Sequence, residues 1–232
     1  MNKRAENSET LLPFLKRVPL FAGLSETDLL VFACVCRLER VPKGYILFQR
    51  GDAASAAYLV RSGAIAVLVS TMDGRELVVN ELRAGDCFGE LALLTGKPRS
   101  ATAMAIEPSE FLLLPRAELM AQLEREPRVM RHLLESLAER LAATTERESE
   151  LAFLDAPARL ARTLLALEKA ATPPEEIRIS HDELARRIGA TRQTVTKVLG
   201  RWRRAGWIAS RRHRVVLRDR RALQERADDK TF

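Results

Sequence analysis

The spacing of apolar residues changes along the chain, and each change predicts a different kind of structure. Residues 11–32 read as short helices, with Pro13 and Pro19 interrupting the first part and Ser25 capping a second helix. From Arg37 onward, short apolar stretches alternate with turn residues at intervals of about ten positions, which predicts an antiparallel β-roll or barrel. The turn sequences are Pro42-Lys43-Gly44, Arg50-Gly51-Asp52, Arg61-Ser62-Gly63, Asp73-Gly74 and Gly85-Asp86.

The later part of this β region contains a predicted hairpin and two further strands. Residues 72–75 have the sequence of a hairpin tip, and they join predicted strands at 64–71 and 76–82. Residues 101–105 and 111–114 supply the last strands of the roll.

A heptad pattern beginning at Pro127 predicts one long helix. Its seam advances in alternating steps of four and three residues through the apolar positions Met130, Leu134, Leu137, Leu141 and Leu151, with a polar break at Thr144 and Glu148. Such a seam is typical of helices that pair as a coiled coil, so we expect two copies to meet in a symmetric dimer. Packing of this helix onto its own β-roll is the alternative.

The sequence Asp155-Ala156-Pro157 ends this helix and marks a domain boundary. We therefore predict three segments: a β-roll domain at 1–126, a dimerisation helix and hinge at 127–155, and a second domain at 156–232. The predicted fold class is α+β, with a jelly-roll-like antiparallel roll followed by helices.

Residues 179–199 have the pattern of a helix, a tight turn and a second helix. Ser180 and Glu183 form a capping box, Gly189 supplies the turn, and Thr191 caps the second helix. An apolar face for packing the two helices together comes from Leu184, Ile188, Val195, Val198 and Leu199. The residues left outward near the start of the second helix are Arg192, Gln193, Thr196 and Lys197, as in a recognition helix that enters the major groove.

A short hairpin follows the second helix. Residues 207–210 and 215–217 flank the basic sequence Arg211-Arg212-His213-Arg214. This arrangement predicts a wing that contacts the phosphate backbone of DNA.

Charge supports a polyanionic partner for the second half alone. The whole chain carries a net charge of +7, yet residues 157–232 hold 19 Lys and Arg against 9 Asp and Glu. Residues 1–156 hold 19 Lys and Arg against 22 Asp and Glu. The excess of positive charge therefore lies in the predicted helix-turn-helix domain.

Composition also limits the function classes. The chain is 47% apolar and 30% charged, and no apolar run approaches the ~20 residues that cross a bilayer, so we expect a cytoplasmic protein with no membrane partner. Cys34 and Cys36 are too close for an ordinary disulfide, and we expect both to be small buried residues. The three cysteines and three histidines lack metal-site spacing, so no metal is expected.

Residues 88–102 carry the clearest candidate binding site. Gly89 allows close approach of the backbone, Glu90 can accept a hydrogen bond from a ribose hydroxyl, and the amides of the helical turn at Glu90 and Leu91 face an anion. Arg99 offers a planar fork to phosphate oxygens and Ser100 adds a small donor. Without a bound anion, we expect Arg99 to lack a partner within residues 88–102, the segment that we call the cassette.

The segment at 88–102 resembles the phosphate-binding cassette of the cyclic-AMP receptor family of bacterial transcription regulators, and the resemblance extends over about residues 12–218. It implies that Thr144 and Thr145 contact the nucleotide base, one from its own subunit and one across the seam. It also implies backbone contact near His181. The family reads DNA with an arginine, a glutamate and a second arginine, where this chain has Arg192, Gln193 and Lys197.

Together these features predict a homodimeric transcription regulator that a cyclic nucleotide switches, with cyclic AMP as the first candidate. Cyclic GMP, cyclic di-GMP or no nucleotide are the alternatives. The expected partners are a near-palindromic DNA operator, a second copy of the chain and RNA polymerase. An enzyme is disfavoured because no nucleophile–base constellation and no second phosphate loop are present. The predicted DNA-binding residues are His181, Thr191, Arg192, Gln193, Thr196, Lys197, Arg211 and Arg212.

Overall fold

The structure is a computed structural model that describes residues 11–70, 76–170, 176–211 and 213–229. Its contacts divide the chain into two compact units, one made of Met1–Val69 with Asn80–Ala142 and the other of Ser70–Val79 with Ala143–Phe232. The predicted hairpin tip at 72–75 and Arg212 lie outside the described residues.

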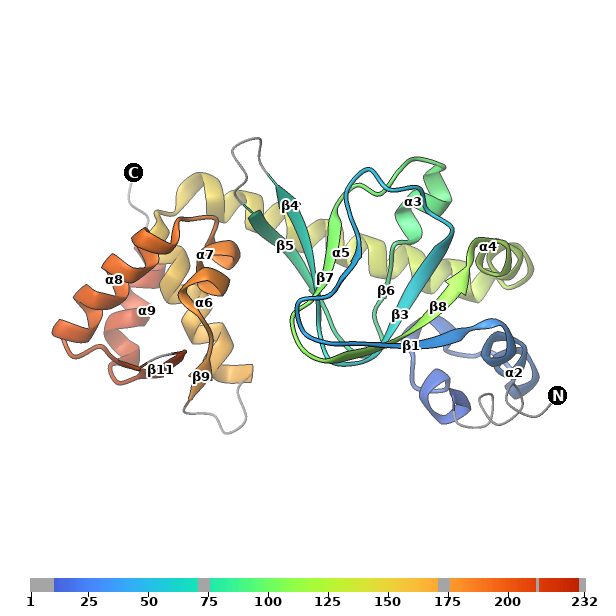
Figure 1. Cartoon of the computed structure of the whole chain (residues 1–232), viewed down its shortest axis with the longest axis horizontal. Coiled ribbons are helices and arrows are strands. Elements are labelled where there is room, and N and C mark those ends of the chain that lie inside the picture. The colour runs from blue at the N-terminus through green and yellow to red at the C-terminus, as the bar shows by residue number, and fades with distance from the viewer. Residues whose placement is uncertain (1–10, 71–75, 171–175, 212, 230–232) are drawn as a thin grey trace. The chain divides into compact units, whose positions relative to one another are not determined.

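Two four-stranded antiparallel sheets form the predicted roll (Figure 1). The first has the order β1-β8-β3-β6, with β1 at Arg37–Val41, β8 at Ser109–Pro115, β3 at Ala56–Ser62 and β6 at Cys87–Phe88. The second has the order β2-β7-β4-β5, with β2 at Ile46–Phe48, β7 at Thr102–Ala105, β4 at Ile65–Ser70 and β5 at Glu76–Leu82. The neighbours of β8 come from distant parts of the sequence, so turn spacing alone could not reveal this order.

Alternating side chains of these strands fill the roll. Val60, Ile65 and Phe111 are at most 1% exposed, and they share one core cluster with Leu82 and Phe88. Aromatic rings extend this cluster, because Tyr58 stacks on Phe88 with ring centroids 5.1 Å apart. The strands are therefore held by a continuous apolar interior, as their period of two predicts.

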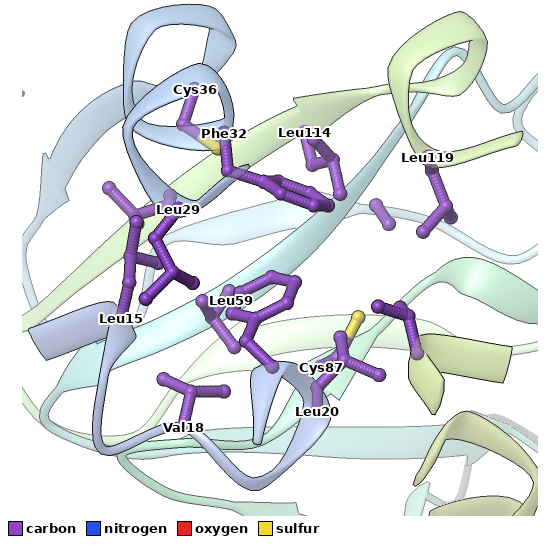
Figure 2. Packing of buried hydrophobic residues seen from close by; sticks show 14 of the residues in the cluster. Leu15, Val18, Leu20, Leu29, Phe32, Cys36, Leu59, Cys87, Leu114 and Leu119 are labelled. Atoms are coloured by element: carbon purple, nitrogen blue, oxygen red, sulfur yellow. The ribbon is translucent and has the colours of Figure 1, made fainter. Parts of the chain in front are cut away.

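Short helices close the outer face of the first sheet. Residues 11–15 are helical, and they are followed by a 3₁₀ turn η1 at Pro19–Phe21 and by α2 at Glu26–Val35. The Oγ of Ser25 accepts a hydrogen bond from the Asp28 amide, so the predicted cap is confirmed. Figure 2 shows Leu29 and Phe32 of α2 packed near Leu59 and Leu114 of the sheet.

The cysteine prediction is half right. Cys36 and Cys87 are buried in the core that α2 covers (Figure 2). Cys34, by contrast, is exposed. Cys34 and Cys36 are both near the end of α2, but only Cys36 faces the apolar interior. Burial raises the pKa of the Cys36 thiol to about 12, so this group stays protonated.

Three further helices complete this part of the chain: α3 at Glu90–Thr95, α4 at Arg116–Arg125 and α5 at Pro127–Phe153. Helix α5 has two apolar faces. Val129 and Leu133 are buried in the core that α2 covers, and Leu137 of the predicted seam packs partly against the same core. Three further seam residues, Met130, Leu134 and Leu141, are 43%, 61% and 68% exposed.

The second unit contains the predicted helix-turn-helix. Its elements are α6 at Ala156–Ala170, β9 at Ile177–Arg178, α7 at His181–Ile188, α8 at Arg192–Arg204, β10 at Ile208–Arg211, β11 at Arg214–Leu217 and α9 at Arg220–Asp228. The strands form a sheet in the order β10-β11-β9. Leu160 and Leu164 of α6 share a core with Trp202 of α8 and Leu223 of α9. Trp202 stacks on Trp207 with ring centroids 5.9 Å apart.

None of the helices in the described part of the chain combines the length and the apolar character that crossing a bilayer requires.

Candidate functional site

The cassette begins with a backbone conformation that only glycine adopts easily. Gly89 has φ +76° and precedes α3, and a Cβ built at this position would lie 2.6 Å from Nη1 of Arg99 and 3.3 Å from Tyr58. The first of these distances is shorter than real Cβ atoms show, and the second is tighter than most Cβ contacts. Gly89 therefore serves two purposes: it permits the left-handed turn and leaves room for the guanidinium of Arg99.

Arg99 is buried and has partners, so the expectation that it lacks them is wrong. The residue is 4% exposed. Its Nη1 donates to the Gly89 carbonyl oxygen at 2.5 Å, and its Nη2 donates to the Ala56 carbonyl oxygen at 2.6 Å. Its guanidinium carbon also lies 4.2 Å from the ring centroid of Phe48. The sequence distance to Ala56 is 43 residues, which explains why the local pattern did not reveal this partner.

These contacts leave part of the Arg99 donor set unused. Its Nε is buried and has no hydrogen-bond partner within the described part of the chain. Burial lowers the pKa of the Arg99 guanidinium, while Tyr58, Glu90 and Asp52 act in the opposite direction. Arginine nevertheless remains protonated in proteins. The cassette therefore holds a desolvated positive charge beside the exposed Ser100.

Glu90 supplies the matching buried acceptor. The residue is 3% exposed, and its Oε1 accepts a hydrogen bond from Nη1 of Arg140 at 3.0 Å. Its Oε2 is buried, and the described residues provide it with no partner. Burial raises the pKa of the Glu90 carboxyl, and Arg140 is the largest opposing influence. The neighbouring Leu91 is 46% exposed on α3.

Arg140 is a site residue that the sequence analysis missed. It comes from α5 and also donates to the Cys87 carbonyl oxygen, so it joins the long helix to both ends of the turn that carries Gly89. The sequence did contain a signal for the role of Arg140, because this residue follows Val129, Leu133 and Leu137 at helical spacing. A charged residue on the face that packs against the roll needs a partner there.

The two unpaired buried atoms fit a nucleotide. Oε2 of Glu90 can accept from a ribose hydroxyl, and the unused donors of Arg99 can reach phosphate oxygens. A buried polar atom without a partner costs free energy, so a ligand that pairs with both atoms gains from relieving that cost. Thr144 and Thr145 are exposed on α5 within the second unit, and their role in base contact stays a prediction.

The helix-turn-helix has the local interactions that the sequence predicted. The Ser180 Oγ accepts from the Glu183 amide at 3.1 Å, and the Glu183 carboxylate accepts from the Ser180 amide at 2.9 Å. Gly189 ends α7 with φ +62°, and the Thr191 Oγ1 accepts from the Thr194 amide at 3.1 Å. These caps fix the start of both helices.

The predicted base-reading side chains lie together on the exposed face of α8. Val195, Val198 and Leu199 are buried against the core of the unit, which leaves outward the exposed residues Arg192, Gln193, Thr196 and Lys197. This half of α8 therefore presents donors and acceptors that suit base edges.

The start of α7 lies beside this face. His181 Nδ1 is 2.8 Å from the Thr196 Oγ1, and an Asp182 carboxylate oxygen is 3.7 Å from Nη1 of Arg192. Burial lowers the pKa of His181, with Arg192 and His213 acting in the same direction and Asp182 in the opposite one.

The predicted wing is present as β10 and β11. Arg211 is exposed at the end of β10, while Arg214 at the start of β11 pairs with Glu176 at 2.9 Å. His213 has φ +58°, and its carbonyl oxygen accepts from the Ile179 amide, which ties the wing to the strand before α7.

The predicted hinge is held by arginines that the sequence analysis did not assign. The Asp155 carboxylate accepts from the Ala158 amide at 2.8 Å and also pairs with Arg226 of α9. Arg159 donates to the Ile188 carbonyl oxygen at 2.8 Å, and Arg162 pairs with Glu150 at 3.0 Å. Glu150 of α5 is therefore bonded to α6, Asp155 just after α5 is bonded to α6 and α9, and Arg159 joins α6 to α7, all within the second unit.

Two further observations bear on other ligands. In the described ranges, no group of three or more His, Cys, Asp or Glu side chains is arranged to hold a metal. A surface pocket of about 590 Å³ lies between α2, β1 and the start of α4, and residues such as Cys34, Leu38 and Glu118 line it. None of the predicted site residues lines this pocket.

Two family models match the chain. The cyclic nucleotide-binding domain matches residues 38–126, and the Crp-like helix-turn-helix domain matches residues 158–226. These ranges contain Gly89, Glu90, Arg99 and Ser100 in the first case and the whole α7–α8 pair in the second.

Curated relatives and solved structures agree with these matches. The Cyclic AMP receptor protein of Thermus thermophilus is 33% identical over 211 residues, which cover 91% of this chain and 97% of that protein. The cAMP-activated global transcriptional regulator CRP of Pasteurella multocida is 35% identical over 174 residues, which cover 72% of this chain and 83% of that protein. The structure of the c-di-GMP responsive global regulator CLP of Xanthomonas campestris aligns with a TM-score of 0.73 at 29% identity, covering 79% of this chain and 94% of that one.

Proposed function

The chain belongs to the CRP/FNR family of transcription regulators, and from this premise we propose that it is a homodimeric DNA-binding switch whose effector is cyclic AMP. It is a cyclic-nucleotide-responsive regulator rather than an enzyme. The observation that carries the proposal is the pair of buried, unpaired atoms, Oε2 of Glu90 and Nε of Arg99, in one cassette.

The residues of the cassette have separate parts in binding. Arg99 and Ser100 hold the cyclic phosphate, with the amides of Glu90 and Leu91 facing the same anion. Glu90 accepts from the ribose hydroxyl through Oε2. Thr144 and Thr145 contact the purine base, and because they belong to the seam of α5, the second copy supplies one of them.

When the nucleotide binds, its phosphate replaces hydrogen-bond acceptors that Arg99 already has. The guanidinium now donates to the carbonyl oxygens of Gly89 and Ala56. A phosphate competes with these neutral acceptors, and its charge makes it the stronger partner. Movement of Arg99 changes the field at Glu90, whose other oxygen is bound to Arg140 of α5. The cassette and the long helix are thereby coupled, and the effector shifts the population of α5 arrangements.

The seam of α5 supports the homodimer. Met130, Leu134 and Leu141 are exposed apolar side chains at heptad spacing. When two copies bury these side chains, the dimer is symmetric and its two recognition helices lie about 34 Å apart. This distance equals one turn of DNA. The expected operator is therefore near-palindromic. Affinity for it falls steeply with salt, because Arg211, Arg212 and the helix ends neutralise phosphates.

With this function we also propose domain limits, a protein partner, a cellular location and roles for the residues of α8. The domain limits are 1–126, 127–155 and 156–232, RNA polymerase is the further protein partner, and the site of action is the cytoplasm. On α8, Arg192, Gln193, Thr196 and Lys197 read the bases, with Thr191 and His181 contacting the backbone.

Cyclic di-GMP is the second candidate effector, because a structural relative of 29% identity is named as responsive to it. The cassette favours a single cyclic phosphate, since one buried arginine serves it. Binding of cyclic di-GMP in preference to cyclic AMP would reverse this ranking.

Calorimetric titration of the full chain with cyclic AMP, cyclic GMP and cyclic di-GMP tests the effector. The expected result is saturable heat with cyclic AMP at one site per subunit. Footprinting with and without the nucleotide that binds tests the switch. Equal operator occupancy in both cases would overturn it, and sedimentation of the same sample tests the dimer.

A further inference from the structure

The first turn of α7 makes two contacts with the DNA-facing side of α8. His181 Nδ1 lies 2.8 Å from the hydroxyl of Thr196, and Asp182 Oδ2 lies 3.7 Å from Nη1 of Arg192. Both partners on α8 belong to the exposed set that faces DNA in the proposed function. Asp182 is not among the predicted DNA-binding residues, and a carboxylate is a poor neighbour for phosphate.

Stability of the fold does not explain the Asp182–Arg192 pair. The two side chains are 52% and 69% exposed, and ion pairs this exposed contribute little in water. The start of α7 is already fixed by the capping box of Ser180 and Glu183. Asp182 does lie favourably in the first turn of the helix, but a solvated carboxylate anywhere in that turn would serve the helix dipole as well.

We propose that Asp182 is a specificity-positioning residue that holds the guanidinium of Arg192 for base reading. The inference rests on the proposed function, in which Arg192 reads a base. At 3.7 Å the carboxylate restrains one Nη of Arg192 electrostatically without occupying the whole donor fork. The other edge of the planar group then stays available to the O6 and N7 atoms of guanine.

The physical gain is pre-ordering. A long arginine side chain in water samples many rotamers, and it loses this freedom when it binds a base edge. A carboxylate on the neighbouring helix removes part of that freedom before DNA arrives. It also penalises every base pair that offers Arg192 no acceptor, because Asp182 then brings an uncompensated negative charge toward the duplex.

Asp182 therefore has two effects of opposite sign, and this separates the proposal from a merely structural or merely electrostatic role. Its charge weakens binding to all DNA sequences. Its contact with Arg192 strengthens discrimination at one base pair. Neutralising the carboxylate raises general affinity and lowers selectivity together.

The test compares Asp182→Asn and Arg192→Ala in the full nucleotide-bound chain, measured by fluorescence anisotropy. The duplexes are an operator chosen by selection and its single-base variants, together with an unrelated duplex. Arg192→Ala first locates the base position whose discrimination it removes. We expect Asp182→Asn to reduce discrimination at this same position by about 3- to 10-fold. We also expect it to tighten binding to unrelated DNA, because a negative charge near the phosphates is removed.

Three controls accompany this comparison. Glu225→Gln removes an exposed, paired carboxylate from α9 of the same unit and should leave discrimination unchanged. Asp182→Glu keeps the charge and should retain most of the selectivity, even if Asp182→Asn folds poorly. The double variant of Asp182→Asn and Arg192→Ala should discriminate no worse than Arg192→Ala alone.

Each outcome decides a different question. If Arg192→Ala removes discrimination and Asp182→Asn only raises affinity equally on every duplex, the positioning role is refuted and the proposed function stands. If Arg192→Ala changes affinity equally on all duplexes, Arg192 reads no base, and both the positioning role and that part of the proposed function fail.

Discussion

Two arginines show how differently the two halves of this protein use the same charge. Arg99 is 4% exposed and makes two hydrogen bonds to carbonyl oxygens, whereas the Arg192 side chain is 69% exposed beside one carboxylate. A buried charge must always have partners, so exchanging them rearranges the surroundings. An exposed charge exchanges partners with water at little cost. The cassette is therefore suited to switching and the recognition helix to graded selection among sequences.

Replacement of Arg99 should have the largest effect. Arg99→Leu removes the only buried guanidinium of the described cassette residues, and nucleotide affinity should fall by about 3 kcal/mol, roughly 100-fold. Calorimetry measures this loss. Lys97→Ala, which removes an exposed charge from the same loop, is the matched control and should bind nearly normally. Normal response of the Arg99 variant would disprove the cassette.

Replacement of Gly89 should have the second largest effect. Gly89→Ala places a Cβ 2.6 Å from Nη1 of Arg99 in a left-handed conformation, so we expect about 1–3 kcal/mol of strain together with weaker nucleotide binding. Gly96→Ala is a close control, because Gly96 has φ +68° but open space around its Cβ position. Thermal unfolding should report strain for both variants and calorimetry a binding defect for Gly89→Ala alone. Equal binding by both would mean that room for Arg99 is unimportant.

On the DNA side, Arg192→Ala should cost about 1–3 kcal/mol of binding to the operator, concentrated at one base position. Anisotropy titrations on single-base variants of the operator measure this cost. A fall in the salt dependence without any change of base preference would place Arg192 on the phosphate backbone instead.

The hinge should show a smaller effect on stability. Asp155→Ala removes the acceptor for the Ala158 amide and the partner of Arg226, so unfolding free energy should fall by about 0.5–2 kcal/mol. Asp219→Ala removes a comparable cap from α9, where the carboxylate accepts from the Ala222 amide at 2.9 Å. Only the Asp155 variant should also change the nucleotide dependence of DNA binding. The same nucleotide dependence in both variants would limit Asp155 to capping.

The smallest effect concerns pH. Burial lowers the pKa of His181 from its usual 6.5, so the unfolded chain binds a proton more readily than the folded one just below that pH. Stability contributed by the neutral imidazole is therefore present above pH 6.5 and is lost as the pH falls toward the lowered pKa. Denaturant unfolding at pH 7.5 and pH 5.5 should show a flatter pH dependence for His181→Gln. An unchanged slope would contradict this reading.

The sequence predicted elements whose determinants are local. The capping box of Ser180 and Glu183, the turn at Gly189 and the cap at Thr191 each depend on a few adjacent residues, and each is found where it was expected. The order of residues 88–102 indicated a cyclic nucleotide-binding domain for the same reason, and the family model over residues 38–126 agrees.

What the sequence did not predict depends on contacts between distant residues. Arg99 donates to Ala56, and Arg140 reaches Glu90 from 50 residues away. Helix α9 was not predicted, although its Leu223 is fully buried in the second core. Cys34 was expected to be buried and is exposed, because it lies two residues before Cys36 and two residues of helix turn a side chain to roughly the opposite face.

The stacked indoles of Trp202 and Trp207 give the chain a built-in optical reporter. They are the two tryptophans of the whole sequence, and both belong to the unit that carries the recognition helix. Selectively excited indole emission therefore comes from this unit alone, whatever the roll does. A change of that emission on adding nucleotide, before any DNA is present, would record the arrival of the signal in the unit that carries the recognition helix, without a dye or an engineered label.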